Sequence, residues 1–204
     1  MINIRYAQIR ECDVSNGEGV GVALFVQGCH LRCYNCFNKD TWDFNGGKEW
    51  TPEVEDKFIE LASRPYIKRI SILGGEPLAD ENLDGVLNLV NKIRLLCPNK
   101  TIWLYTGYTL STCEYLGETI FTFNPYYYHP NPLNGQPVKV DDKSFFIKQD
   151  RKRVEITKLI DVLVDGRYID SQRNPSKKWA GSDNQRVINV SESLKQNKVI
   201  LYCD

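Results

Sequence analysis

The sequence lacks an excess of charge of either sign, and it lacks a long hydrophobic run. Its 26 basic and 26 acidic residues cancel, which leaves no bulk electrostatic reason for nucleic acid or an anionic membrane to be the main partner. No apolar run approaches the roughly 18 residues of a membrane-spanning helix, and the charged start MINIRYAQIRECD is unlike a signal peptide. We therefore expect a soluble, cytoplasmic protein whose partner is neither nucleic acid nor membrane.

Histidine is scarce as well. The chain has only His30 and His129, and it offers no Ser/His/Asp set. A hydrolase that uses histidine as its general base is therefore hard to build from this sequence.

Length and composition favour one domain. The 204 residues suffice for a single domain with a substantial core and are marginal for two. The composition, 42% hydrophobic and 25% charged, is ordinary for a globular protein, and no internal repeat is visible. We expect a single domain that spans residues 1–204.

The one cluster of cysteines lacks a fourth member. Seven cysteines cannot all pair with one another, and clustered thiols in a reducing compartment are more often metal ligands than disulfides. Cys29, Cys33 and Cys36 lie in VQGCHLRCYNCFN at C-x3-C-x2-C spacing. Three thiolates this close can hold three corners of a [4Fe–4S] cluster, which leaves the fourth iron open to bind another molecule. The other four cysteines are scattered, and we expect small buried residues or spectators.

A structural zinc site is the alternative for this cluster. It would be of the Cys3His type, with His30 or His129 as the fourth ligand. His30 directly follows Cys29, which is an awkward position from which to complete the same tetrahedron. A coincidental grouping of cysteines is a further alternative.

The first half of the chain alternates between strand and helix patterns. Apolar, β-rich runs predict strands at 20–27, 69–73 and 101–105. Thr51-Pro52 indicates the start of one helix, and Asp80 is the expected cap of a second, longer one. Strands joined through helices in this way form a parallel sheet, so we expect an α/β fold.

The second half is less regular. Four prolines, an Asn-Gly turn and three consecutive tyrosines indicate a loop or hairpin inserted at about 118–155. DVLVD then predicts another core strand at 161–165. Two short strands are candidates at 186–190 and 198–202, and we expect a variable tail at about 191–204.

Two groups of special residues follow neighbouring strands of the expected sheet. The cysteine loop follows strand 20–27, and the segment GGEP (74–77) follows strand 69–73. Ligands bind at the carboxyl ends of parallel strands, where glycines let the backbone approach a ligand and Glu76 can accept hydrogen bonds from an ammonium group. A simple strand-to-helix turn also uses glycines, so GGEP alone is a weak signal.

The cysteine loop followed by Gly-Gly-Glu resembles the radical S-adenosylmethionine (SAM) superfamily. Within it, the chain is similar to the activating proteins of anaerobic ribonucleoside-triphosphate reductases, over most of residues 5–118 and 156–190. The stretches that carry this likeness are NGEGVGVALFVQGC, CFNKDTW, GGEPL, LCPNKTIWLYTGYTL, DVLVDGRY and NPSKKWAGSDNQRVI.

The resemblance implies a partial (β/α) barrel of the radical SAM type and two cofactors, a [4Fe–4S] cluster and SAM. The open iron would chelate the amino and carboxylate groups of the methionine end of SAM. The resemblance assigns the cluster to Cys29, Cys33 and Cys36, the methionine end to Gly74, Gly75 and Glu76, the adenosine to Asn35, Cys36 and Phe37, and the ribose or a cation to Thr106 and Asp165. Roles in turns are the alternative for Thr106 and Asp165.

Two positions depart from the superfamily pattern. Asn35 stands where an aromatic residue often precedes the third cysteine, and Leu73 stands where a small polar residue commonly precedes Gly-Gly. Flanking Tyr34 and Phe37 are the candidates for the ring near the adenine.

The resemblance also implies an activity. A one-electron donor such as a flavodoxin reduces the cluster, and SAM is cleaved to methionine and a 5′-deoxyadenosyl radical. The radical takes a hydrogen atom from a glycine near the C-terminus of the anaerobic reductase, its protein substrate. The segment 179–185 is a candidate for the mouth where that glycine loop enters, with packing of the tail as the alternative, and Tyr126–Tyr128 for a docking surface, with self-packing as the alternative.

Three alternatives stay open at this point. One is activation of a different glycyl radical enzyme, and another is a small radical SAM enzyme such as 7-carboxy-7-deazaguanine synthase, which shares the cysteine loop. The third is a zinc-stabilised interaction module without catalysis. The stretches DVLVDGRY and NPSKKWAGSDNQ favour the reductase-activating family over these.

Overall fold

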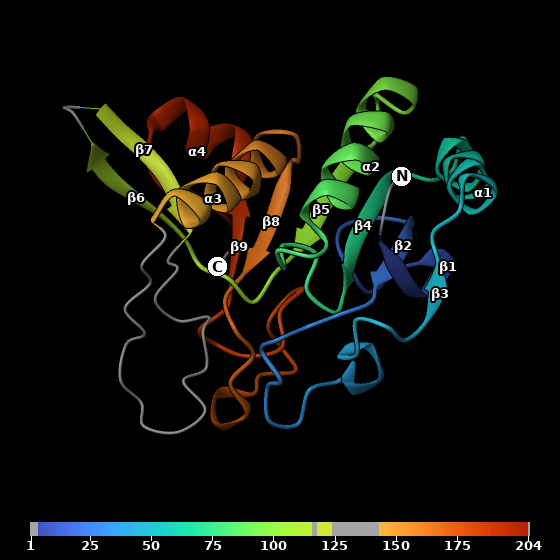
Figure 1. The fold of residues 1–204 in the computed structure, drawn as a ribbon, viewed down its shortest axis with the longest axis horizontal. Coiled ribbons are helices and arrows are strands. Elements are labelled where there is room, and N and C mark those ends of the chain that lie inside the picture. Colours follow the sequence, from blue (N-terminus) through green and yellow to red (C-terminus); the bar gives the residue numbers. More distant parts are fainter. Residues whose placement is uncertain (1–3, 116–117, 124–142, 204) are drawn as a thin grey trace.

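The computed structural model describes residues 4–115, 118–123 and 143–203, and its main feature is an eight-stranded sheet (Figure 1). The strand order is β10-β9-β8-β5-β4-β2-β1-β3, and β6 and β7 form a separate hairpin. The strands are β1 (Arg5–Asp13), β2 (Gly21–Val26), β3 (Lys48–Glu49), β4 (Arg69–Gly74), β5 (Thr101–Tyr105), β6 (Leu110–Tyr115), β7 (Glu118–Phe123), β8 (Val162–Asp165), β9 (Arg186–Asn189) and β10 (Leu201–Cys203).

Four parallel strands form the centre of the sheet. β2, β4, β5 and β8 pair in parallel, with Val26 opposite Gly74 and Ile72 opposite Leu104. These strands confirm the predictions made for 20–27, 69–73, 101–105 and 161–165. Because the strands run in the same direction, the loops after β2 and β8 come out at the same edge, at the bottom of Figure 1. How far the sheet curves toward the partial (β/α) barrel expected from the resemblance stays a prediction.

Antiparallel strands flank this centre, and the sequence pattern did not indicate the first of them. β1 pairs antiparallel with β2, and β9 pairs antiparallel with β8. The strand at 20–27 is therefore the second strand of the chain and not the first. β1 lies near the edge of the sheet with most of its residues partly or fully exposed, so it lacks the continuous apolar run that identifies a buried strand.

Two helices connect the parallel strands as expected, with one difference in capping. α1 (Pro52–Ser63) begins at the predicted Thr51-Pro52, and Thr51 Oγ1 accepts a hydrogen bond from Val54 N at 3.4 Å. α2 (Leu83–Leu96) follows Asn82, whereas the sequence pointed to Asp80 as its cap. Asp80 instead forms an ion pair with Arg153, a long-range contact that local sequence cannot reveal.

The segment expected as a loop or hairpin at 118–155 holds regular structure at both ends. β7 pairs with β6, and α3 (Lys143–Lys158) packs against α2. Arg153 Nε of α3 donates to Leu78 O, in the turn before α2, at 3.0 Å. Asp150 of α3 accepts hydrogen bonds from Phe123 N at 2.8 Å and Thr122 Oγ1 at 2.6 Å. Tyr126–Tyr128 lie outside the described residues.

The tail is also more regular than expected. β9 confirms the strand proposed at 186–190, and β10 overlaps the candidate at 198–202. Between them lies a short helix, α4 (Val190–Gln196), which the sequence analysis missed. Its cap is Asn189, whose Oδ1 accepts a hydrogen bond from Glu192 N at 3.1 Å.

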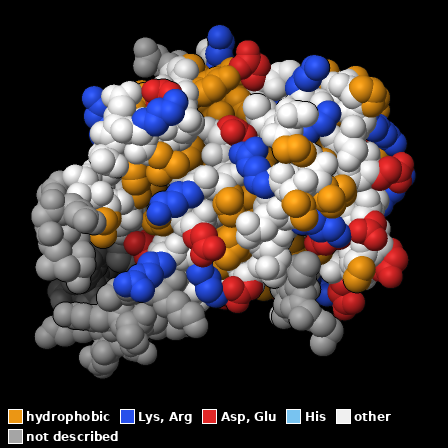
Figure 2. All heavy atoms as spheres, turned by 90° about the horizontal axis from the view of Figure 1, so that it is seen from above, with side chains coloured by type: hydrophobic (Ala, Val, Ile, Leu, Met, Phe, Trp, Pro, Cys, Tyr) orange, Lys and Arg blue, Asp and Glu red, His pale blue; other side chains and the backbone are white. Residues whose placement is uncertain are grey.

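The two faces of the sheet have different surroundings. One face packs under the helices, and its side chains form the main hydrophobic core, including Val22, Leu24, Ile70, Ile72, Ile102, Leu104 and Leu163. Alternation along the strands places Ala23, Phe25, Leu73, Trp103, Tyr105 and Val164 on the other face, away from this core. The face seen from above Figure 1 carries acidic and basic side chains mixed with hydrophobic ones (Figure 2). No helix among the described residues is long and apolar enough to cross a bilayer.

A buried arginine fixes the loop between β1 and β2, which leads into the amino end of β2. Arg69, the first residue of β4, is fully buried, and its Nη2 contacts Asp13 Oδ1 at 3.0 Å. The same guanidinium donates to the carbonyls of Asn16 at 2.7 Å and Gly19 at 3.1 Å. Burial alone would raise the pKa of Asp13, but hydrogen bonds from Asn16 and Arg69 outweigh it and hold that pKa below its ordinary value.

We predict that Asp13→Asn destabilises the protein by about 3–5 kcal/mol at neutral pH, because it leaves the Arg69 charge buried without its partner. The measurement is the free energy of unfolding in urea. Since the folded-state pKa of Asp13 is lowered, its contribution is complete above its unfolded-state pKa and is lost as the pH falls through the lower folded-state value. The difference between variant and wild type should therefore shrink in acid.

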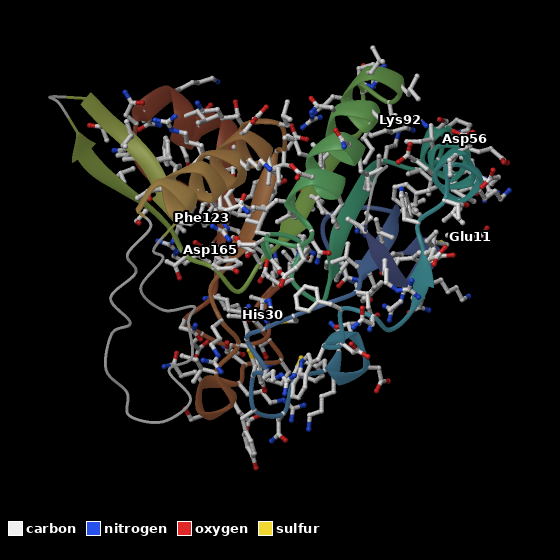
Figure 3. The ribbon with its side chains drawn as sticks, viewed as in Figure 1. Glu11, His30, Asp56, Lys92, Phe123 and Asp165 are labelled. Carbon is white, nitrogen blue, oxygen red and sulfur yellow. The ribbon has the colours of Figure 1, made fainter. Side chains whose placement is uncertain are left out.

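Asp56→Asn is the matched control. Asp56 of α1 lies 3.0 Å from Lys92 Nζ of α2 with a 74% exposed side chain, and Figure 3 labels both residues on the outer surface. An exposed pair of this kind contributes about 0–1 kcal/mol. Equal stability losses in the two variants would contradict the role assigned to the buried pair.

Candidate functional site

A cavity of about 810 Å³ lies at the carboxyl edge of the parallel strands. It brings together residues from the loops after β2, β4 and β5, which are distant in the sequence. Figure 3 labels His30 in the cysteine loop and Asp165 at the end of β8 on this side of the sheet. Among the residues predicted from the sequence, the cavity is lined by Cys29, Cys33, Cys36, Phe37, Gly74, Gly75, Glu76 and Thr106.

The cysteine loop is closed at its base by backbone hydrogen bonds. Gly28 N donates to Thr41 O at 2.8 Å, and Cys29 N donates to Trp42 O at 3.1 Å. Within the loop, Arg32 and Asn35 adopt left-handed backbone conformations, with φ of 45° and 54°. These two turns curl the chain tightly, so that all three cysteines reach the same cavity.

The thiols are shielded to different degrees. Cys29 and Cys33 are each 8% exposed, and Cys36 is partly exposed. Burial raises the pKa of Cys29 to about 12, and the nearby Glu76 charge adds to this effect. Burial also raises the pKa of Cys33, against the opposing effect of Arg167. A bound metal centre would overcome this effect at Cys29 and Cys33, because a coordinated thiol is deprotonated outright.

The arrangement of these donors does not suit a single metal ion. Within residues 4–115, 118–123 and 143–203, no three side chains of His, Cys, Asp or Glu are placed to hold one ion. One zinc ion with Zn–S bonds of about 2.3 Å would draw its sulfurs to within about 4 Å of each other, whereas a [4Fe–4S] cluster binds each cysteine through a separate iron. The donor set therefore fits a cluster better than zinc.

The proposed histidine ligands do not complete a zinc site either. His30 Nε2 lies 2.7 Å from Glu81 Oε1, and its ring packs on Phe44 with centroids 4.4 Å apart. The imidazole is thus engaged outside the group of thiols. Position 129 lies outside the described residues.

Glu76 is a buried carboxylate held by three hydrogen bonds. Oε1 accepts from Thr106 Oγ1 at 2.7 Å and from Leu78 N at 2.9 Å, and Oε2 accepts from Gly107 N at 2.8 Å. Burial raises its pKa to about 7, against the opposing effect of these hydrogen bonds. A cation bound in the cavity would favour the ionised form, so the site is suited to an ammonium group. Thr106 acts here by holding Glu76, and its hydroxyl hydrogen is not free for a ribose.

The two glycines before Glu76 allow the strand-end turn to touch the cysteine loop. Gly74 has a φ of +108°, which side-chain-bearing residues rarely adopt, and a Cβ at Gly75 would lie 2.4 Å from Gly28 O. Glu76 N donates to the same Gly28 carbonyl at 2.7 Å. These glycines therefore position Cys29 and Glu76 relative to each other, in addition to any contact with a ligand.

Asp165 has a different role from the one predicted. Its fully buried carboxylate accepts a hydrogen bond from Leu110 N at 2.8 Å and one from Arg186 Nε at 2.9 Å. Its neighbours Val164 and Gly166 line the cavity, and Asp165 itself does not. This corrects the expectation of a carboxylate free to contact a ribose or cation, and it is the role in a turn that the sequence left open.

The adenosine residues predicted from the sequence lie at the rim. Phe37 is 69% exposed, and its ring contacts Tyr168 edge-on with centroids 5.5 Å apart. Asn35 Nδ2 donates to Asp170 Oδ2 at 3.1 Å. An aromatic face at the rim suits an adenine ring, and the assignment of Asn35, Cys36 and Phe37 to the adenosine stays a prediction.

The segment 179–185 packs on the sheet and also lines the cavity, and its role as the mouth for a glycine loop stays a prediction. Trp179, Ala180, Gly181 and Gln185 line the cavity. Trp179 also packs edge-on against Trp103, with centroids 4.9 Å apart, and holds a φ of 56°. The tail therefore packs on the sheet and forms one wall of the cavity.

Sequence reasoning missed two further residues of the cavity wall. Trp42 Nε1 and Tyr105 Oη are buried and have no hydrogen-bond partner among the described residues. Trp42 belongs to the stretch CFNKDTW, and Tyr105 ends the predicted strand 101–105. Unpaired polar atoms of this kind are expected where a ligand completes the bonding, so the wall fits a bound polar group.

Two comparisons with known proteins, one with family models and one with curated relatives, bear on the family of this chain. A family model described as a 4Fe-4S single cluster domain matches residues 15–121 and 141–188. The part between the two matched ranges is 122–140, and α3 lies within the matched region. The extent of the insertion expected at about 118–155 stays a prediction.

Curated relatives match this chain over nearly their whole length. The anaerobic ribonucleoside-triphosphate reductase-activating proteins of Vibrio cholerae and Escherichia coli K12 are 35% and 36% identical over 186 residues, which covers 90% of this chain and 97% of each relative. That of bacteriophage T4 is 31% identical over 185 residues, covering 90% of this chain and 93% of the relative. The chain thus belongs to the family of anaerobic ribonucleoside-triphosphate reductase-activating proteins.

Proposed function

We infer that this chain is a radical SAM enzyme that generates a glycyl radical on an anaerobic ribonucleoside-triphosphate reductase. One observation carries the chemistry: a single cavity holds three cysteines from one loop and the buried carboxylate of Glu76 from the next strand end. The relatives are named as activating proteins of this reductase, so the reductase is the protein on which the enzyme acts.

The cofactors supply the reactive chemistry when they are bound. A [4Fe–4S] cluster held by Cys29, Cys33 and Cys36 would supply the electron for the reductive cleavage of SAM, and SAM would supply the group that takes the hydrogen atom from the glycine. The protein residues bind, orient and shield.

The residues of the cavity divide into three roles. Cys29, Cys33 and Cys36 would hold three irons as thiolates. Glu76 would accept hydrogen bonds from the SAM ammonium, and its orientation is already fixed by Thr106 and the backbone at Gly107. The Phe37 ring would cover the adenine at the rim. No step needs a general acid or base, which agrees with a cavity lined by no histidine among the described residues.

We propose further that the glycine segment near the C-terminus of the reductase enters this cavity, and that a flavodoxin-like protein donates the electron near Cys36. Cys36 is the most exposed of the three thiols, and Tyr34 and Phe37 beside it are 77% and 69% exposed. Exposed arginines at 32, 167 and 173 surround this surface and would attract an acidic donor.

The fold proposed with this function is a partial (β/α) barrel in one domain. The four parallel strands β2, β4, β5 and β8 all contribute their carboxyl ends or the following loops to one cavity. The face of the sheet opposite the helices would then form the barrel interior, open on one side for a macromolecular substrate.

We predict that Cys33→Ala abolishes cofactor cleavage. The wild type, reconstituted anaerobically with iron and sulfide, should be brown and should form 5′-deoxyadenosine from SAM with dithionite. The variant should fall to background, because two thiolates no longer anchor the cluster. Cys12→Ala is the control, since Cys12 is exposed and does not line the cavity. A colourless wild type that carries one zinc ion and makes no 5′-deoxyadenosine would overturn the assignment.

We predict that Glu76→Gln weakens SAM binding by about 10- to 100-fold, the range expected when one charged hydrogen bond is lost. Calorimetric titration of SAM into the reconstituted protein measures the affinity, and the iron content shows that the cluster is intact. Glu81→Gln is the control, because Glu81 pairs with His30. If the wild type and Glu76→Gln bind SAM with equal affinity, Glu76 does not bind the SAM ammonium group.

A further inference from the structure

Tyr105 presents a buried hydroxyl that the fold itself does not use. Its ring packs beside Ala23, Phe25 and Leu73 on the face of the sheet opposite the helices. Its hydroxyl oxygen is buried and has no hydrogen-bond partner in the part of the chain that the structure describes, and the residue lines the same cavity as the cysteines. A phenylalanine would fill this apolar position without the cost of an unpaired polar atom.

Other tyrosines near the cavity are bonded within the protein. Tyr168 Oη donates to Asp170 Oδ1 at 2.8 Å, and Tyr202 Oη donates to Glu18 Oε2 at 2.5 Å. The free hydroxyl of Tyr105 is therefore a local feature of the cavity wall, and it points to a partner that is not part of this chain.

The Tyr105 ring lies on a face of the sheet that also carries polar groups. Alternation along β4 and β5 places Ser71, Leu73, Trp103 and Tyr105 on this face. Ser71 Oγ donates to Asn16 O at 2.6 Å, so the loop that contains Asn16 packs against the same face.

One part of the cavity wall is polar. Arg10, Ser15 and Asn16 line the cavity, on β1 and on the loop that Arg69 holds. The guanidinium of Arg10 lies 4.5 Å from the centre of the Phe25 ring. The wall thus offers several hydrogen-bonding groups that are not among the residues expected to hold the cofactors.

A glycine residue offers an enzyme few groups by which it can be recognised. It carries no side chain, so at the reacting residue only its peptide N–H and carbonyl can be hydrogen-bonded. A phenol hydroxyl can donate to a peptide carbonyl, and a buried position makes that bond selective, because an unmatched group there is costly.

We propose that the Tyr105 hydroxyl donates a hydrogen bond to a backbone carbonyl of the reductase's glycine segment and holds that segment in the cavity. Tyr105 is then a substrate-binding residue that acts on the protein substrate and not on SAM. The inference rests on the proposed function, since it requires a glycine segment as the substrate.

The test is Tyr105→Phe in the full-length, reconstituted protein. Iron content, thermal stability, SAM affinity and 5′-deoxyadenosine formation without reductase should match the wild type. The KM for the reductase, followed by the electron paramagnetic resonance signal of the glycyl radical, should rise about 3- to 10-fold, as expected for one hydrogen bond. The affinity of a synthetic peptide with the reductase's C-terminal glycine sequence should fall by the same factor in fluorescence anisotropy.

Two further variants complete the comparison. Tyr202→Phe removes a hydroxyl that bonds Glu18, and it should leave the peptide affinity unchanged. Tyr105→Trp keeps an N–H donor at the position and should retain more peptide affinity than Tyr105→Phe. Equal losses of peptide affinity in the Trp and Phe variants would overturn the proposed hydrogen bond. The Trp variant also keeps the test available if the Phe variant folds poorly.

The outcomes separate this inference from the function on which it rests. A wild type that cleaves SAM but makes no radical on the reductase would overturn the proposed function. A wild type that makes the radical while Tyr105→Phe keeps full affinity for reductase and peptide would overturn only the role of Tyr105. A loss of SAM affinity in Tyr105→Phe would also overturn it, by assigning the hydroxyl to the cofactor.

Discussion

The site depends on one close backbone contact between two loops. The carbonyl of Gly28, beside the first cysteine, accepts a hydrogen bond from Glu76 N, and Gly75 passes so near to it that a Cβ would lie 2.4 Å away. The parallel register of β2 and β4, with Val26 opposite Gly74, brings the two loops to this position. Through this contact the cysteines and the Glu76 carboxylate share one cavity, and any side chain at position 75 would force them apart.

Much of the fold could be read from local patterns, because the central strands are continuous apolar runs and α1 carries its own cap. The errors arose where tertiary contacts decide the structure. β1 lies near the edge of the sheet and shows no clear apolar run. Asp80 has the chemistry of a helix cap but pairs with Arg153 from the far side of the insertion. α3 has a weakly apolar sequence, and polar contacts help to hold it, such as the ion pair of Lys152 with Asp84 of α2 and the hydrogen bond from Arg153 to Leu78 O.

The candidate site was predictable to the extent that residue type alone expresses the chemistry. The cysteines and Glu76 are such residues, and the structure places them together. Asp165 has the same acidic chemistry as Glu76, yet its carboxylate is occupied by Arg186 and Leu110 N, which a single sequence does not show. Trp42 and Tyr105 were missed for the converse reason: their significance lies in hydrogen bonds that the fold leaves unmade.

The way Asp150 joins α3 to the end of β7 bears on how this family can vary. Its carboxylate accepts hydrogen bonds from Phe123 N and Thr122 Oγ1, so the end of β7, which precedes 124–142, is held to α3, which follows it. When the elements on both sides of a connection are held in this way, each doubling of its length costs only about 0.6 kcal/mol of closure free energy. Evolution can therefore lengthen, shorten or replace this stretch in different lineages and leave α3, and with it the turn beside Glu76, in place.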